Sequence, residues 1–297
     1  MQVAQSVARS EPGIAGKARV IPSGKGCGAE VRGGDLKALS EEAFAVLHQA
    51  LLDHLVVLVR GQPLTDPQLV DLGKRFGDLE PPGMSIIGKP YIDEYPDILV
   101  ISNIVEDGQP KGNLGAGEAI WHTDMSYRAQ PVSYAILHAL EIPPAGGNTY
   151  FANQYMAYET LPQDLKRTLE GKLIIHDETY NSAGQLRKGF KEVADPRLAP
   201  GARHPVFRTH PLTGRKALYI GRRKNAYIVG LALDESERLL DKLWQHASQP
   251  EFVWGHQWSV GDTLVWDNRC LIHRRDPFDA SARRMVHRVQ IKGERPA

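Results

Sequence analysis

Two tripeptides in this chain place a histidine two residues before an acidic side chain, a spacing that suits a metal site. They are His122-Thr123-Asp124 and His176-Asp177-Glu178. Residues i and i+2 of a β-strand point to the same side, so either tripeptide could offer an imidazole and a carboxylate to one ion. Two histidines and one carboxylate on one face of the ion are the usual ligands of mononuclear non-haem iron, and they leave positions open for a co-substrate and oxygen.

The surroundings of the two tripeptides favour the first as the metal site. With 11 histidines and 35 acidic residues in the chain, about one or two such tripeptides are expected by chance. His122 follows a tryptophan and the glycine-rich segment Gly115-Ala116-Gly117, a candidate lid, whereas His176 ends the apolar run Leu173–Ile175 and enters a polar loop. We therefore predict that His122 and Asp124 are ligands and that His176 is an ordinary strand-end residue.

A third ligand must come from elsewhere in the chain, and His273 is the candidate. It follows the predicted strand Thr263–Trp266, a tight turn at Asp267-Asn268 and a short apolar run. This pattern is typical of a strand, a turn and a second strand that delivers one side chain.

Two arginines fall on one face of the last predicted strand. Arg284, Val286 and Arg288 are two residues apart, so their side chains share one side. Two guanidiniums buried together need anions to pair with, and arginine binds carboxylates through a bidentate fork. A solvated basic strand at a sheet edge explains the pattern equally well, so the local sequence leaves both interpretations open.

Hydrophobic periodicity and turn residues predict the elements that must position these side chains. The 28 glycines and 20 prolines suit a turn-rich β protein. We expect a loose N-terminal leader over residues 1–17 and a single domain over 18–297, mainly β with peripheral helices (α+β). The first predicted helix follows the cap residue Ser40 and has Phe44, Leu47, Leu51 and Leu52 at helical spacing. The other predicted helices are Asp66–Phe76, roughly Asn153–Glu170, and Asp234–His246. The predicted strands are Leu55–Val59, Ile98–Ser102, Tyr134–Ala139, Thr149–Phe151, Lys172–His176, Val206–Thr209, Ala217–Ile220, Thr263–Trp266 and Val286–Ile291.

The overall composition argues against several classes of partner. The 36 basic and 35 acidic residues give a formal net charge of +1, so we expect no nucleic-acid and no membrane partner. No apolar run is long enough to span a bilayer, and Met1–Glu11 lacks the apolar core of a signal peptide. Cys27 and Cys270 form no CxxC pattern, which argues against a disulfide scaffold or thiolate zinc site and fits the cytoplasm.

Several motifs occur together and in a fixed order along almost the whole chain. They are Trp121-His122-Thr123-Asp124, Pro143-Pro144-Ala145-Gly146-Gly147-Asn148-Thr149, Arg208-Thr209-His210-Pro211, Trp266-Asp267-Asn268-Arg269 with His273, and Arg284 to Arg288. The set resembles the taurine dioxygenase/2,4-dichlorophenoxyacetate dioxygenase (TauD/TfdA) family of iron(II)- and 2-oxoglutarate-dependent dioxygenases. The family usually has aspartate where this chain has Asn148.

The resemblance implies a double-stranded β-helix (jelly-roll, cupin-like) core. It also implies a dioxygenase that uses Fe(II), O2 and 2-oxoglutarate as co-substrate, hydroxylates a C–H bond, and releases succinate and CO2. By resemblance, His122, Asp124 and His273 are the metal ligands and the catalytic centre, while Arg284 and Thr149 bind the far carboxylate of 2-oxoglutarate. Members of the family are commonly dimers or tetramers, so we expect a homodimer or homotetramer.

The substrate implied by the resemblance is a small organic anion. Arg288 matches the position that often meets the acidic group of the prime substrate. The segment Glu80–Met84 lacks the histidine and tyrosine expected of taurine enzymes, so we favour an aryloxyalkanoate-like acid, hydroxylated next to an ether oxygen, sulfur or nitrogen. Further candidate substrate contacts are Glu118, Met84 and Tyr127. The run Arg222-Arg223-Lys224 could add positive charge near the mouth of the site, but we favour a solvated turn.

Three alternatives stay open. A taurine, alkylsulfonate or alkyl sulfate dioxygenase would use the same residues on another substrate. A zinc hydrolase with the same two histidines and aspartate would leave Thr149 and Arg284 without a role. A non-catalytic jelly-roll binding protein would not need the three ligands that this chain keeps.

Overall fold

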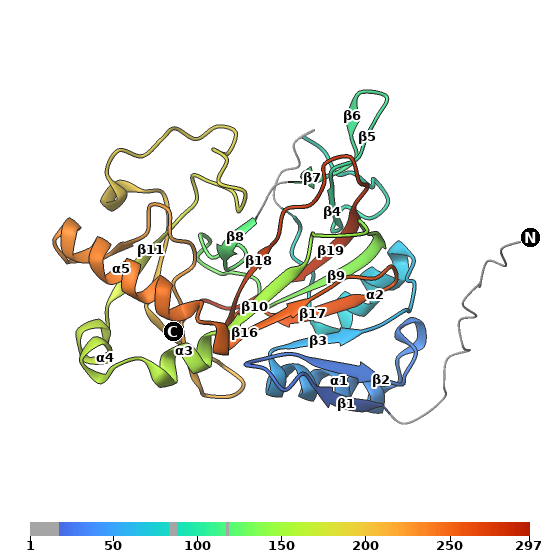
Figure 1. Ribbon diagram of the computed structural model, residues 1–297, viewed down its shortest axis with the longest axis horizontal. Coiled ribbons are helices and arrows are strands. Elements are labelled where there is room, and N and C mark those ends of the chain that lie inside the picture. The colour runs from blue at the N-terminus through green and yellow to red at the C-terminus, as the bar shows by residue number, and fades with distance from the viewer. Residues whose placement is uncertain (1–17, 83–87, 117–118) are drawn as a thin grey trace, which may run out of the picture.

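The computed structural model describes residues 18–82, 88–116 and 119–297. The expected leader over residues 1–17 and the candidate residues Met84, Gly117 and Glu118 lie outside these ranges. Two β-sheets form the centre of the described structure and helices lie around them (Figure 1). The expectation of a sheet-rich protein with peripheral helices is therefore confirmed.

The larger sheet contains eight described strands and the smaller sheet four. In spatial order the larger sheet is β1 (Arg19–Pro22), β2 (Ala29–Arg32), β3 (Val56–Val59), β17 (Thr263–Asp267), β9 (Tyr134–Glu141), β19 (Met285–Ile291), β4 (Leu99–Ser102) and β7 (Asn113–Leu114). The smaller sheet is β16 (Val253–His256), β10 (Thr149–Asn153), β18 (Leu271–Arg275) and β8 (Ala119–His122).

From β4 onward the chain passes repeatedly between the two sheets. Strands β4, β9, β17 and β19 are neighbours in the larger sheet, while β8, β10, β16 and β18 form the smaller one, and the neighbours within each set pair antiparallel. Leu137 and Leu264 of the larger sheet join Phe151 and Leu271 of the smaller sheet in one buried cluster. The core that supports the site therefore lies between the two sheets.

Helices α1 (Glu41–His54) and α2 (Asp66–Phe76) cover the other face of the larger sheet (Figure 1). Leu51 of α1 and Leu69 of α2 pack with Ile136 of β9 and Val289 of β19. Successive residues of a strand point to opposite faces, so the neighbours of Val289 on β19, Arg288 and Gln290, point toward the space between the sheets.

A third group of elements packs beside the smaller sheet. It consists of α3 (Gln154–Thr160), α4 (Gln163–Leu169), α5 (Leu233–Ala247), the sheet β12 (Gly201–Pro205), β11 (Leu173–Asp177) and β15 (Tyr227–Ile228), and the hairpin β13 (Phe207–Thr209) and β14 (Lys216–Leu218). Ile174, Leu218 and Leu240 share a buried cluster with Ile272 of β18. The remaining elements are β5 (Val105–Glu106), β6 (Gln109–Pro110) and the 3-10 turns Leu36–Ala38, Pro196–Leu198 and Pro250–Phe252.

The structure corrects two expectations about secondary structure. The helix expected over Asn153–Glu170 is two helices, because Pro162 disfavours helical geometry at Leu161 and lacks the N–H that would continue the ladder. Strand β8 ends at His122, so Asp124 lies in the turn that follows and not on the same strand. The other predicted helices and strands are confirmed, with ends displaced by at most about two residues.

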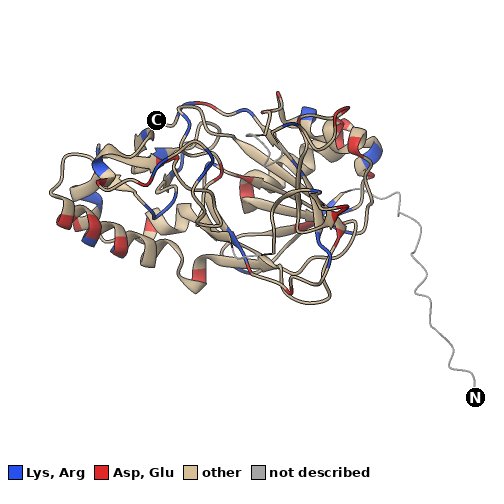
Figure 2. Ribbon diagram, turned by 90° about the horizontal axis from the view of Figure 1, so that it is seen from above, with Lys and Arg blue, Asp and Glu red and all other residues tan. Residues whose placement is uncertain are grey.

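Charged residues of both signs are interspersed along the peripheral helices. Figure 2 shows them together, and on α5 the exposed Arg238 pairs with Asp234 at 2.7 Å. Within the described ranges, the structure contains no helix with the length and apolar character needed to cross a bilayer.

Candidate functional site

His122, Asp124 and His273 come together between the two sheets. All three are buried, and their ligand atoms lie within 4.8 Å of one another. His122 Nε2 is 3.4 Å from Asp124 Oδ1, and His273 Nε2 is 3.9 Å from Asp124 Oδ2. The register of the smaller sheet explains this proximity, because His273 of β18 pairs with His122 of β8. Two imidazoles and one carboxylate at these spacings fit a divalent metal ion.

The surroundings of the two histidines suit metal ligation. His122 Nδ1 lies 2.7 Å from the carbonyl oxygen of Ile120, so Nδ1 donates its proton there and Nε2 keeps a lone pair for a metal. Burial, with His122 adding to its effect, lowers the pKa of His273 to about 3, so this imidazole is neutral. Phe151 of β10 stacks on the His273 ring at a centroid distance of 6.0 Å.

Asp124 is held as a carboxylate by the groups around it. Burial would raise its pKa, but the positive charge of Arg288 holds the pKa well below its usual range. Arg288 Nη1 donates to Oδ2 of Asp124 at 2.7 Å, and Gln290 Nε2 donates to the same atom at 3.0 Å. The carboxylate is therefore ionised and fixed in position before any metal binds.

Sequence reasoning missed two of the residues that position Asp124. Gln290 lies two residues after Arg288 on β19 and so continues the two-residue period that starts at Arg284, just before the strand; that period could have identified it. Asn268, in the turn between β17 and β18, accepts a hydrogen bond from the Asp124 amide at 3.0 Å and donates to the Asp124 carbonyl at 2.9 Å. These two bonds hold the Asp124 backbone beyond the end of β8, where strand pairing does not reach.

Arg284 is a buried cation that has no counter-charge among the described residues. Its side chain is among the fully buried ones, with 2% of the residue exposed. Within the described ranges it makes no ion pair, and its Nε has no hydrogen-bond partner. Burial, with the charge of Arg275 adding to it, lowers the pKa of Arg284 to about 9. Because an unpaired buried charge is unfavourable, this position calls for an anion from outside the chain.

Thr149 begins β10 and is also buried. Its Oγ1 accepts a hydrogen bond from Trp258 Nε1 at 2.9 Å, which leaves the hydroxyl hydrogen able to donate to a ligand. Gly147, two residues before Thr149, lies beside the Arg284 side chain. A Cβ placed on Gly147 would lie 3.4 Å from Arg284 Nε. The glycine therefore keeps space open beside the guanidinium.

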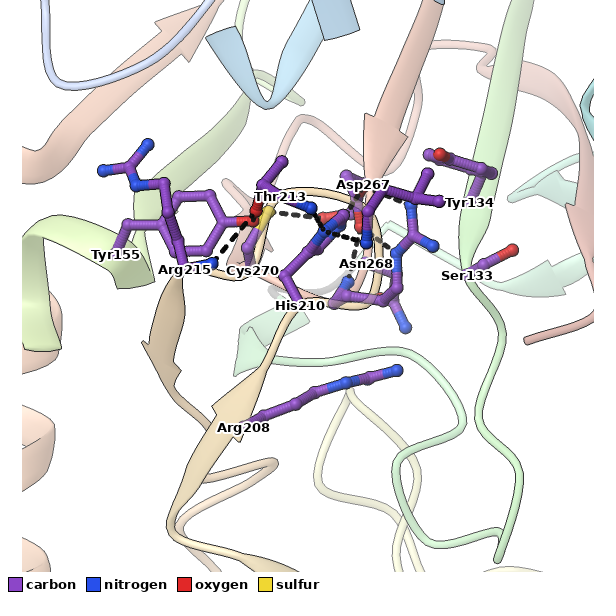
Figure 3. A network of polar contacts seen from close by, with 12 residues as sticks. Ser133, Tyr134, Tyr155, Arg208, His210, Thr213, Arg215, Asp267, Asn268 and Cys270 are labelled. Carbon is purple, nitrogen blue, oxygen red and sulfur yellow. Dashed lines mark hydrogen bonds and ion pairs between the residues drawn. The ribbon is translucent and has the colours of Figure 1, made fainter. Parts of the chain in front are cut away.

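A buried polar network locks the turn that delivers His273 (Figure 3). Asp267 accepts hydrogen bonds from Arg269 Nε at 2.8 Å and Nη2 at 2.6 Å, and from His210 Nε2 at 2.9 Å. Burial would raise the pKa of Asp267, but Arg269 and then His210 hold it well below its usual range. The network ties the loop after β13 to the turn before β18.

His210, Asp267 and Cys270 also lie within 4.8 Å of one another, but they do not offer a second metal site. Both ring nitrogens of His210 are used, because Nε2 donates to Asp267 and Nδ1 accepts from the amides of Leu212 and Thr213. Burial raises the pKa of the Cys270 thiol well above its usual range, so it is not a thiolate. This cluster is therefore structural.

Replacing Asp267 with asparagine is expected to lower the free energy of unfolding by about 3–5 kcal/mol, because it leaves the buried Arg269 with only Glu294, 3.9 Å away, as a counter-charge. Urea unfolding monitored by tryptophan fluorescence measures the change. Asp234→Asn on α5 is the matched control, since it breaks an exposed ion pair and should cost less than about 1 kcal/mol. Equal effects of the two substitutions would contradict the structural role of Asp267.

Of the other predicted substrate contacts, the structure describes only Tyr127, and the role of all three stays a prediction. Tyr127 is buried, its hydroxyl accepts a hydrogen bond from Arg187 Nη1 at 2.9 Å, and that guanidinium lies 4.2 Å from the ring centroid. Glu118 and Met84 fall outside the described ranges, so their role stays a prediction. In the candidate lid, the Gly115 carbonyl accepts a hydrogen bond from Arg275 Nη2 at 3.1 Å, and movement of this segment stays a prediction.

The solvated turn expected at Arg222-Arg223-Lys224 is wrong for its first residue. Arg222 is only 5% exposed, and its Nη1 donates to the Tyr180 carbonyl at 2.6 Å. The reason is that the preceding residue, Gly221, accepts a hydrogen bond from the Thr123 amide at 2.9 Å, which draws this end of the turn into the interior. Arg223 and Lys224 lie nearer the surface.

His176 lies in a separate buried cluster of rings. Its ring packs against His204 at 4.9 Å and Tyr219 at 5.1 Å between centroids. Burial lowers the pKa of His176 well below its usual value. It does not belong to either group of possible metal ligands in the described part of the chain, which agrees with its interpretation as a structural residue.

Comparison with known proteins places these features in a wider group. The family model described as "Taurine catabolism dioxygenase TauD, TfdA family" matches residues 19–290. The chain is 37% identical over 250 residues to the alpha-ketoglutarate-dependent 2,4-dichlorophenoxyacetate dioxygenase of Cupriavidus pinatubonensis, covering 81% of this chain and 86% of that protein. It is 32% identical to the (S)-phenoxypropionate/alpha-ketoglutarate-dioxygenase of Delftia acidovorans, covering 93% and 95% of the two chains. A crystal structure of a putative alpha-ketoglutarate-dependent taurine dioxygenase from Burkholderia xenovorans has a TM-score of 0.76 at 30% identity and covers 94% of this chain and 91% of its own.

Proposed function

This chain belongs to the TauD/TfdA family of 2-oxoglutarate-dependent dioxygenases, and from that premise we propose that it hydroxylates a small aryloxyalkanoate-like acid. The observation that carries the proposal is the combination of a buried site of two histidines and one carboxylate with a buried, unpaired Arg284. The first fits Fe(II) and the second fits the far carboxylate of 2-oxoglutarate. Hydroxylation of the substrate carbon next to its ether oxygen would give an unstable hemiacetal, and the substrate would then break at that carbon–oxygen bond.

The residues of the site have separate roles in this proposal. His122, Asp124 and His273 would hold Fe(II), which when bound activates O2 with electrons from 2-oxoglutarate. Thr149 would donate its hydroxyl hydrogen to the carboxylate held by Arg284. Protein groups thus orient the reactants in a buried site from which water is excluded.

Arg288 is proposed to contact the acidic group of the prime substrate. Its Nη1 is engaged by Asp124, but its Nε has no hydrogen-bond partner among the described residues. The relatives named for 2,4-dichlorophenoxyacetate and phenoxypropionate support an aryloxyalkanoate as this substrate. Tyr127, Glu118 and Met84 are proposed as further contacts.

The finer points of architecture and location are also proposals. The passage of the chain between β4, β9, β17 and β19 in one sheet and β8, β10, β16 and β18 in the other supports a double-stranded β-helix. The buried, free thiols of Cys27 and Cys270 support a cytoplasmic enzyme. A homodimer or homotetramer stays a prediction that light scattering can test.

A succinate-release screen tests the proposed function. The purified enzyme with Fe(II), 2-oxoglutarate and O2 is offered aryloxyalkanoates, taurine, alkylsulfonates and alkyl sulfates, each with a control without O2. We expect oxygen-dependent succinate above the background mainly with the aryloxyalkanoates. Turnover of only taurine, a sulfonate or an alkyl sulfate would overturn the proposed substrate class and support the alternative within the same family.

A further inference from the structure

Arg222 and Arg187 converge on one carbonyl oxygen. Arg222 Nη1 donates to the Tyr180 carbonyl at 2.6 Å, and Arg187 Nε donates to the same atom at 3.2 Å. Neither guanidinium forms an ion pair with a carboxylate of the described residues, and Arg222 Nε is buried with no hydrogen-bond partner there. Burial, with the charge of Arg187 adding to it, lowers the pKa of Arg222 to about 10. The two positive charges therefore share one neutral oxygen, with no carboxylate of the described residues in direct contact with either.

This pair of arginines lies beside the metal ligands. The carbonyl of Gly221, the residue before Arg222, accepts a hydrogen bond from the amide of Thr123, which lies between the ligands His122 and Asp124. The charge of Asp124 acts on Arg222, and the charge of Arg222 acts on His273, so the guanidinium is within electrostatic reach of the triad. The unmet charge is therefore close to the place where a substrate must bind.

Arg288 and Arg284, the two arginines already assigned to the site, have other partners in this account. Arg288 Nη1 is bonded to Asp124, so part of its charge balances a metal ligand. Arg284 lies beside Gly147 on the approach to Thr149 and is assigned to the co-substrate. Arg222 is a buried guanidinium near the triad that neither of these roles uses.

We propose that Arg222 is a specificity-determining residue that binds the anionic group of the prime substrate, through Nε and the nitrogen not bonded to Tyr180. Arg187 is a positioning residue, because it donates hydrogen bonds to both the Tyr180 carbonyl and the Tyr127 hydroxyl and so fixes the segments that surround Arg222. The inference rests on the proposed function and specifies where the acid of its substrate binds. Arg288 then adds a second contact to the same acid group.

Anaerobic calorimetry with the enzyme loaded with Fe(II) and 2-oxoglutarate tests this role. The probe is phenoxyacetate, and phenoxyacetamide serves as its uncharged analogue. Arg222→Gln is expected to weaken phenoxyacetate binding about 30-fold or more, while its affinity for phenoxyacetamide and for 2-oxoglutarate stays that of the wild type. Arg223→Gln is the matched control, since Arg223 pairs with Glu237 and Asp241 and should not affect either ligand.

The outcomes separate this inference from the proposed function. Wild-type affinity for phenoxyacetate in Arg222→Gln, or equal losses for phenoxyacetate and its amide, would overturn the role of Arg222. Should the glutamine variant fail to fold, Arg222→Lys keeps the charge without the fork and is expected to weaken phenoxyacetate binding alone, so unchanged binding would again overturn the role. Octyl sulfate binding that depends on Arg222, without phenoxyacetate binding, would keep Arg222 but reject the aryloxyalkanoate class. Failure of the wild type to bind phenoxyacetate, taurine or octyl sulfate, with 2-oxoglutarate binding intact, would overturn both proposals.

Discussion

Replacing Arg284 with methionine should weaken the binding of 2-oxoglutarate about 30- to 5,000-fold, the range expected when one partner of a buried charge pair is removed. The guanidinium is buried and lacks an ion-pair partner among the described residues, and the co-substrate is the counter-charge that we propose for it. The same substitution should leave the melting temperature of the ligand-free protein unchanged or raise it, because methionine fills the space without an unpaired charge. Calorimetry and thermal unfolding measure the two effects.

The neighbouring arginine offers a control for this result. Arg283 is exposed and pairs with Glu141 and Glu106, so Arg283→Gln should bind 2-oxoglutarate as the wild type does. The assignment of Arg284 is wrong if Arg284→Met keeps wild-type affinity for 2-oxoglutarate. A change confined to the prime substrate would mean that the roles of Arg284 and Arg288 are exchanged.

Asp124→Asn should abolish both metal binding and succinate formation. Asparagine offers a neutral oxygen in place of the carboxylate that, with His122 and His273, makes up the ligand set. The variant without metal should also lose about 3 kcal/mol of unfolding free energy, since Arg288, whose side chain is 13% exposed, is left without its partner. Metal analysis after dialysis and urea unfolding measure these changes.

The second histidine tripeptide provides the matched control for Asp124→Asn. Glu178→Gln alters the acidic residue two positions after His176, whose ring lies in a structural cluster, and should keep wild-type metal content. Equal metal content in both variants would show that Asp124 is not a ligand.

Sequence periodicity predicted the parts of the site that depend on local structure. The strand, turn and strand around Asp267-Asn268 deliver His273 as expected, Arg288 lies on the inner face of β19, and Arg284 immediately precedes this strand and is buried. The preference for the first tripeptide came from its context, since His122 follows a tryptophan and a glycine-rich segment whereas His176 enters a polar loop. Among the described residues, the structure places His122 and Asp124 with His273 in a group that could hold a metal ion, and His176 is outside it.

The parts that were missed depend on contacts between distant segments. The hydrophobic periodicity over Asn153–Glu170 predicts one helix, but Pro162 disfavours helical geometry at the residue before it, and the segment forms two helices. The backbone of Asp124 is held by Asn268, 144 residues away in the chain. From the sequence, Arg222 is expected to be an exposed charged residue like Arg223. Only the structure distinguishes the two, because Arg222 is buried and donates to the Tyr180 carbonyl whereas Arg223 pairs with Glu237.

The central claim is that His122, Asp124 and His273 hold an iron that 2-oxoglutarate chelates, and anaerobic titration tests it most directly. Adding 2-oxoglutarate to the Fe(II)-loaded protein should produce the weak visible charge-transfer band of the chelate, and Arg284→Met should shift its half-saturation to higher 2-oxoglutarate concentration. A metal-loaded protein that shows no such band at any 2-oxoglutarate concentration would contradict the account and favour the zinc hydrolase alternative.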